Sequence, residues 1–105
     1  MRGGRKRFDE PLAVEIEIRA EKARALGRTA RAFEQELARM RAFESHLSTL
    51  PLRERLKLAP ELHALRKSAA RRLWFLVVHR EALGLRRHDD VYEVYGIPSS
   101  LVPNP

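Results

Sequence analysis

Side chains able to carry out acid–base or metal chemistry are few in this chain, and they are not arranged as a site. The histidines are His46, His63, His79 and His88. None has a second ligand at the H-x-x-x-H, H-E-x-x-H or Cys-paired spacings that bind zinc, and the chain contains no cysteine. The densest cluster, His88-Asp89-Asp90, is explained more simply as the capped start of a helix, where adjacent side chains diverge. We therefore expect no metal site and no cofactor.

Candidate nucleophiles are also isolated. The serines are Ser45, Ser48, Ser68, Ser99 and Ser100, and none lies in a nucleophile-elbow or triad-like context. The RGGR segment is not a phosphate-binding loop. His79 follows an apolar run and is a candidate for titration near neutral pH, but a hydrogen-bonded core histidine is the simpler interpretation. The sequence predicts a protein that is not an enzyme and has no catalytic residue.

The positive charge of the chain is concentrated at its start. The 21 Lys and Arg residues exceed the 14 Asp and Glu residues by +7, and four of them lie in the first seven positions. We expect residues 1–8 to form a basic, disordered tail. A solvated terminus is the simpler interpretation; the alternative is a nucleic-acid-associated protein whose arm contacts phosphates together with an arginine-rich second helix. The residues of that alternative are Arg2, Arg5, Lys6, Arg7, Arg66, Lys67, Arg71 and Arg72.

A long amphipathic helix is predicted over residues 10–47. Asp9 can accept hydrogen bonds from the first N–H groups, and Pro11 fits the first turn, where no N–H is needed. From Leu12 to Leu47, apolar residues recur at spacings of three and four, which places them in one stripe. Gly27 interrupts the helix-forming residues and predicts either close backbone contact or a local bend.

A second helix is predicted over residues 60–83. Pro51 ends the first helix, residues 51–60 are expected to form one or two turns, and Pro60 opens the second helix. This helix contains RRLWFLVVHRE (71–81), whose six consecutive apolar residues cannot share one helical face. Taken alone, LWFLVV also fits a buried strand, but the helix-forming residues on both sides favour a helix.

A short third helix is predicted over residues 89–95, because Asp89 and Asp90 suit a helix start and Gly96 a helix stop. Residues 91–102 are expected to fold back as a C-terminal clasp. A helix–turn–helix over DDVYEVYGIPSSLV is the alternative. Tyr92 is too large for the crossing point of such a motif, however, and Pro103 would truncate its second helix.

These elements predict an all-α fold: a long antiparallel helical hairpin, coiled-coil-like, with a short third helix and the clasp. A single domain would span residues 9–102, followed by a tail at 103–105. At 1.5 Å per residue the first helix is about 20 Å longer than the second, so its start would lie uncovered around Leu12, Val14, Ile16 and Ile18. We expect the clasp to cover this extension and the additional faces of LWFLVV. Glu34 and Glu36 are expected opposite the second helix's arginines.

Apolar surface that the hairpin leaves over is predicted to bind a second copy or another protein. The contact between the two helices is expected to use Phe33, Leu37, Met40, Leu73, Trp74, Leu76 and Val77. The candidate interface consists of Leu12, Ile16, Phe33, Leu37, Met40, Trp74, Phe75 and Val78. If Trp74, Phe75 and Val78 are not all covered within one chain, the uncovered member marks the interface.

Three segments, EKARALGRTAR, LWFLVVHREALGLRRHDDV and a terminal YGIP, resemble a small family of uncharacterised bacterial proteins of about this length. The resemblance covers most of residues 12–102 and leaves out the RGGRKR start and the VPNP end. Family members have no assigned activity, cofactor or catalytic residues. The resemblance implies an all-α bacterial cytosolic protein and adds no function.

The longest apolar run has six residues, far fewer than the roughly 20 of a membrane span, and no apolar stretch follows RGGRKR as in a signal peptide. We therefore expect a cytoplasmic protein without membrane contact. The sequence predicts a small helical module for protein–protein interaction or assembly, forming a homodimer or binding a protein partner.

Overall fold

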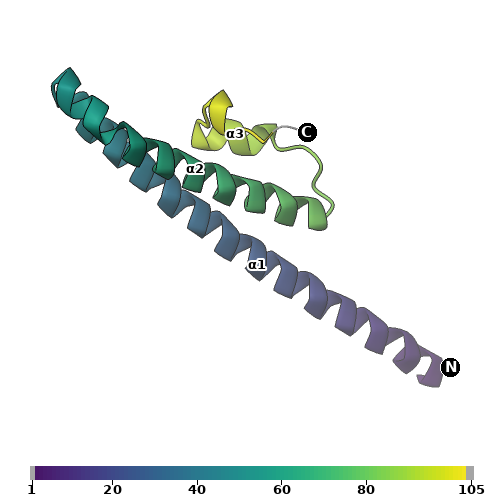
Figure 1. Ribbon diagram of the computed structural model, residues 1–105. Coiled ribbons are helices and arrows are strands. Elements are labelled where there is room, and N and C mark those ends of the chain that lie inside the picture. The colour runs from purple at the N-terminus through teal and green to yellow at the C-terminus, as the bar shows by residue number, and fades with distance from the viewer. Residues whose placement is uncertain (1, 104–105) are drawn as a thin grey trace.

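The computed structural model describes the backbone of residues 2–103 and the side chains of residues 12–103. It contains helix α1 (Arg2–Ser48), helix α2 (Leu52–Ala82), helix α3 (Asp89–Tyr95) and a 3-10 turn, η1 (Ser99–Leu101). α1 and α2 pack side by side as an antiparallel hairpin, and α3 lies next to it (Figure 1). The predicted all-α hairpin with a short third helix is confirmed.

The hairpin core is built from the stripe that the sequence predicts. Phe33 of α1 and Leu73 of α2 are fully buried, and both lie in the middle of the contact between the helices. The other buried core residues are Leu37, Met40, Ala69, Leu76, Val77, Val91 and Leu101. Burial of large side chains stabilises the fold by roughly 1.5–3 kcal/mol each, so this stripe is what holds α2 on α1.

The turn between the helices caps the end of α1 with side-chain hydroxyls. Ser48 Oγ donates to the Ser45 carbonyl at 2.6 Å, and Thr49 Oγ1 donates to the His46 carbonyl at 2.7 Å. These bonds satisfy two carbonyls that the helix end leaves free. Pro51 then precedes α2, as predicted.

α2 begins at Leu52, earlier than the predicted start at residue 60, and Pro60 lies inside it. Proline has no backbone N–H, so Pro60 cannot donate the helical hydrogen bond to the Leu56 carbonyl. Helices can accommodate this missing bond by kinking. The segment LRERLKLA before it consists of strong helix formers. The prediction failed because it treated Pro60 as a boundary, although helix-forming residues lie on both sides of it.

α1 also begins before its predicted start near residue 10. The predicted disordered tail of residues 1–8 and the side chains of its basic arm fall outside the part of the chain whose side chains are described. Most of the predicted tail at 103–105 lies outside it as well.

Both predicted glycine stops have the same geometry. Gly84 (φ 88°) follows α2, and Gly96 (φ 60°) follows α3. At the end of α2, the backbone N–H of Leu85 donates to the Arg80 carbonyl, and that of Gly84 donates to the Glu81 carbonyl. At the end of α3, the N–H of Ile97 donates to the Tyr92 carbonyl, and that of Gly96 donates to the Glu93 carbonyl. This is the Schellman arrangement, which requires the left-handed conformation that glycine adopts without strain.

The clasp, residues 91–102, folds back onto the middle of the hairpin. Val91 and Leu101 are buried there, and the Tyr95 ring packs edge-on against Phe33 with centroids 5.4 Å apart. The Tyr95 hydroxyl donates to Glu34 at 2.6 Å. Arg41 donates to the carbonyls of Tyr95 and Gly96. The clasp is therefore fixed to α1 as well as α2.

The expectation that the clasp covers the start of α1 is wrong. Gly84 directs the chain back along the hairpin, toward its turn, and η1 contacts α2. The N-terminal half of α1 extends alone beyond the end of α2 (Figure 1). The molecule is consequently elongated, 78 × 21 × 19 Å.

Candidate protein–protein interface

The predicted interface residues separate into a buried and an exposed group. Phe33, Leu37 and Met40 lie in the hairpin core, where a partner cannot reach them. Leu12, Ile16, Trp74 and Val78 are exposed, and Phe75 is half-buried. Trp74 was expected between the two helices, but 51% of it is exposed. The three consecutive residues 73, 74 and 75 point in directions about 100° apart, so only Leu73 can face α1.

The first exposed surface is the overhang, which we define as residues 12–25 of α1. Thr29 faces His79, and Glu44 faces Arg66, so the end of α2 at Ala82 lies opposite about residue 26. Residues before that point have no α2 beside them. The overhang exposes four large apolar side chains, each between 50% and 59% accessible. They are Leu12, Val14, Ile16 and Ile18.

The apolar side chains of the overhang point to two sides. Leu12 and Ile16 are four residues apart and continue the buried stripe of the hairpin. Val14 lies two residues from both Leu12 and Ile16, and Ile18 lies two residues from Ile16. At 100° per residue, this second pair therefore points to the opposite side of the helix, about 200° away. A single neighbouring helix cannot cover both sides, so the overhang requires two neighbours to bury them.

The second exposed surface is the Trp74 patch, which we define as Lys67, Arg71, Trp74 and Val78 of α2. Their spacings of four, three and four place them on one face of the helix, beside the face that carries the clasp. All four are exposed. The Trp74 ring also packs edge-on against Phe75 at 5.3 Å, and the Arg71 guanidinium lies 5.6 Å from the centre of the Phe75 ring.

The basic residues of the nucleic-acid alternative that lie in α2 do not form one surface, and the side chains of Arg2, Arg5, Lys6 and Arg7 lie outside the described part. Arg66 forms an ion pair with Glu44 at 3.0 Å, and Arg72 lies on a different side of α2, next to His79. Of the four basic residues in α2, Lys67 and Arg71 share a face. Glu34 and Glu36, which were expected opposite the arginines of α2, have other partners. Glu34 accepts a hydrogen bond from the Tyr95 hydroxyl, and Glu36 forms an ion pair with Arg39 at 3.7 Å.

The histidines that could take part in chemistry have structural bonds. Thr29 Oγ1 lies 3.0 Å from the Ala25 carbonyl oxygen and shares a 2.7 Å hydrogen bond with His79 Nδ1. Arg80 Nε donates to His88 Nδ1 at 3.1 Å, and Arg80 also pairs with Asp90. Within residues 12–103, no group of three or more His, Asp or Glu side chains could hold a metal ion.

The helix–turn–helix alternative is excluded by the backbone. η1 has three residues where a recognition helix would need to lie along a DNA groove.

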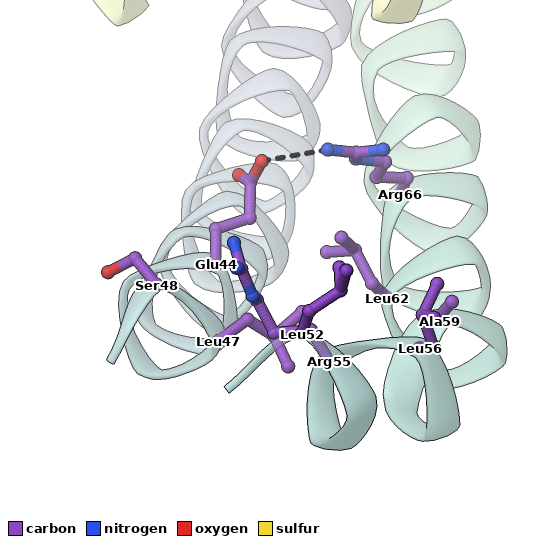
Figure 2. Close-up of a pocket in the computed structure, with 9 residues that line it drawn as sticks. All are labelled: Glu44, Leu47, Ser48, Leu52, Arg55, Leu56, Ala59, Leu62 and Arg66. Atoms are coloured by element: carbon purple, nitrogen blue, oxygen red, sulfur yellow. Dashed lines mark hydrogen bonds and ion pairs between the residues drawn. The ribbon is translucent and has the colours of Figure 1, made fainter. Parts of the chain in front are cut away.

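An open pocket of about 350 Å³ lies between the helices at the hairpin turn. Figure 2 shows Glu44 and Arg66 reaching toward each other from the two helices, above a group of leucines that includes Leu47 and Leu62. This carboxylate and guanidinium neutralise each other, and the other charged side chain that lines the pocket is the exposed Arg55. One exposed cation above leucines does not define a ligand, so we assign the pocket no chemistry.

No protein-family model, curated protein or solved structure matches this chain. The resemblance drawn from the sequence therefore stays a prediction. Among the helices of the described residues, none is long and apolar enough to cross a membrane. The exposed apolar surfaces are thus the features on which a function can be argued.

Proposed function

We propose that this protein is a small assembly module that associates with a second copy of itself through the overhang and performs no catalysis. The observation that carries the proposal is the exposure of four large apolar side chains on one short segment of α1. Scattered apolar residues are normal on a protein surface, whereas a group of this size on an uncovered helix is typical of an interface.

Burial of these side chains supplies the energy for association. Fully covering an aliphatic side chain is worth roughly 1.5–3 kcal/mol, and each overhang side chain is already partly covered by its own helix. Loss of translational and rotational freedom opposes the gain with 4 kcal/mol or more by common estimates, so association requires about four such side chains. The overhang has that number.

The charge order of the overhang favours a second copy as the partner. Glu15 and Glu17 come first, Arg19 and Glu21 lie in the middle, and Lys22 and Arg24 come last. Two copies in parallel would place like charges beside each other, whereas an antiparallel copy meets the opposite sign at each end. An antiparallel pair also has the twofold symmetry of most homodimers.

The proposal is tested by the molar mass in solution, measured by light scattering across micromolar concentrations. We expect a mass of twice 12.2 kDa for the native chain. The double variant L12S/I16S should be monomeric at the same concentration, with an unchanged helical circular dichroism spectrum. Val94→Ser is the matched control, because Val94 is an equally apolar side chain, 80% exposed, outside the overhang. A monomeric native chain contradicts the proposal.

Nucleic-acid association is the second candidate, and one feature favours it. In the Trp74 patch an exposed indole lies on the same face as two cations, and such rings stack on the bases of single strands. Titration of a labelled oligonucleotide across a salt series, with and without residues 1–7, tests it. Phosphate contacts must give affinity that falls with salt and with the deletion. Affinity that does neither rules this candidate out.

A further inference from the structure

We propose that the pocket between α2 and η1 binds the phosphate of a nucleotide, and that Trp74 stacks on the base of the same nucleotide. The pocket has a volume of about 400 Å³ and forms where the clasp meets α2. It is lined by His63, Arg66, Lys67, Ala70, Ser100 and Leu101. The overhang takes no part in this site. The inference therefore goes beyond the proposed self-association, and it gives the nucleic-acid candidate a defined phosphate position.

The pocket is positively charged because its two walls carry cations and no acid. No acidic side chain lines it. α2 has no Asp or Glu between Glu61 and Glu81. The clasp segment 96–102, which includes η1, has no charged side chain at all. Neither wall of the pocket therefore neutralises the cations that α2 places in it, and an anion is the ligand that this charge favours.

Lys67 is the cation that is available to such an anion. Arg66 already pairs with Glu44, through Nη2 at 3.0 Å. Among residues 12–103, by contrast, no ion pair includes Lys67. The clasp adds the Ser100 hydroxyl from the other wall, and a hydroxyl can donate to a phosphate oxygen beside an ammonium group. The site thus needs both α2 and the folded clasp.

Trp74 follows the pocket along α2. Spacings of four, three and four residues place on one face of the helix His63, Lys67, Ala70 and Trp74. Trp74 lies about 6 Å beyond Ala70 along the axis. The Cα–Cβ bond of a helical residue tilts toward the start of the helix, which for Trp74 is the side of the pocket. Because 51% of Trp74 is exposed, a flat ligand can reach its ring.

A nucleotide matches both features, since it has a charged phosphate at one end and a flat base at the other. A lone phosphate or carboxylate would use the cations and leave the indole in water. Duplex bases are already stacked on each other, so the ligand is a free nucleotide or one unit of a single strand. A membrane surface fits less well, because an interfacial helix inserts a broad apolar face and the Trp74 patch is half cationic.

Fluorescence of Trp74 reports on stacking, because it is the single tryptophan of the chain. Titrating the full chain with a single-stranded oligodeoxythymidylate at ~50 mM salt should quench the emission, with an affinity that falls as salt is added. Equal quenching by thymidine monophosphate identifies a free nucleotide as sufficient, whereas quenching by the oligonucleotide alone identifies a strand. Inorganic phosphate should compete without quenching. Absence of quenching by both nucleotide probes overturns the inference.

Substitutions in the pocket locate the phosphate. K67E should weaken binding by roughly tenfold or more and flatten the salt dependence, because a phosphate contact becomes a repulsion. K57E is the matched control, since Lys57 is another exposed lysine of α2 and lies outside the pocket. S100A should weaken binding by roughly two- to tenfold. Helical circular dichroism spectra check that the variants fold. Equal losses in K67E and K57E would show that only net charge matters and would overturn the inference.

Removal of the ring tests the stacking half of the site. Trp74→Ala should weaken binding of a labelled oligonucleotide by roughly tenfold, measured by fluorescence anisotropy of the label. A labelled duplex should bind the native chain more weakly than the single strand. An unchanged affinity of the Trp74→Ala variant overturns the inference, because the base would then lie elsewhere.

This inference and the proposed function fail separately. L12S/I16S should bind the oligonucleotide with native affinity, because the overhang is remote from the pocket. A native chain that dimerises and binds no nucleotide overturns the inference alone. Binding that is lost with residues 1–7 and unchanged in K67E and S100A also overturns it, and places the nucleic acid on the N-terminal arm. Emission that shifts with vesicles of anionic lipid, and with neither nucleotide probe, overturns it in favour of a membrane surface.

Discussion

The two halves of α1 have the same apolar spacing and opposite environments. In residues 26–48 the stripe is buried, and Phe33 is completely inaccessible. In residues 12–25 the stripe continues in phase, yet Ile16 is 59% exposed. The two halves differ because α2 packs only against residues after about residue 26. The clasp folds toward the hairpin turn and does not cover residues 12–25 either. Spacing decides which side chains share a face, and a neighbour decides whether that face is buried.

The comparison predicts its largest effect at the buried half. Phe33→Ala should lower the free energy of unfolding by about 3–5 kcal/mol, since it removes a fully buried ring and leaves a cavity beside Tyr95. Ile16→Ala, at the same stripe in the overhang, should change it by no more than about 0.5 kcal/mol in dilute protein. Urea unfolding followed by circular dichroism measures both. Equal effects would mean that the overhang is covered within one chain.

A smaller effect is expected where the chain turns back onto the buried half. Gly84→Ala should lower the free energy of unfolding by about 1–2 kcal/mol, because φ is 88° there, although a Cβ would have no atom within 4 Å.

Gly27→Ala is the matched control at the start of the buried half. Of the two alternatives predicted for Gly27, the close backbone contact is absent, because a Cβ there would meet only the flexible Arg31 guanidinium at 3.4 Å. This change should stabilise by up to about 1 kcal/mol. Thermal unfolding of both variants checks the opposite signs.

The clasp contact with α1 should be sensitive to alkaline pH. The hydrogen bond to Glu34 raises the pKa of Tyr95 from 10.0 to about 12, assisted by burial and by repulsion between the phenolate and the carboxylate. The folded form therefore disfavours ionisation. Its stabilisation is complete below pH 10 and is lost as the pH rises toward 12. Tyr95→Phe should cost roughly 0.5–1.5 kcal/mol at neutral pH and show a weaker loss between pH 10 and 12.

Tyr92→Phe is the control for that measurement, because burial also raises the pKa of Tyr92. Tyr92 donates no hydrogen bond to Glu34, so its substitution should leave the Tyr95 transition in place. A Tyr95→Phe variant whose pH profile matches that of the native chain would show that the clasp does not depend on this bond.

The smallest effect is expected from the charges of the overhang. Arg28 and Arg24 lower the pKa of Glu21 by hydrogen bonding to it. Whatever stabilisation this provides is present above the ordinary pKa of 4.5 and lost as the pH falls below it. All three side chains are exposed, so solvent screens the interaction. Glu21→Gln should leave the urea midpoint at neutral pH unchanged; a large shift would indicate that Glu21 is buried in an interface.

The sequence predicts the elements well and their contacts less well. The end of α1, the limits of α3, the two glycine stops and most of the hairpin core follow from residue spacing, because these depend on neighbours in the chain. Two predicted boundaries are wrong. α2 begins at Leu52 and not at Pro60, because helix-forming residues lie on both sides of that proline, and α1 begins before residue 10.

The candidate site divides in the same way. Helix lengths predict that α2 leaves Leu12, Val14, Ile16 and Ile18 uncovered, whereas the predicted cover by the clasp is wrong. Trp74 was placed between the helices, because an apolar run on a helix does not indicate which of its faces meets the partner. In the structure Leu73, Leu76 and Val77 occupy the space beside α1 and the clasp, and Trp74 is therefore exposed.

The sequence by itself determined that this chain forms two long helices with one common apolar stripe, a short third helix and a surplus of apolar residues. It did so because helical periodicity and capping are local. Only the tertiary structure decided which residues form that surplus. α2 ends before the overhang begins, and the left-handed turn at Gly84 directs the clasp toward the middle of the hairpin. The overhang and the Trp74 patch remain exposed because burial depends on which segments meet in space.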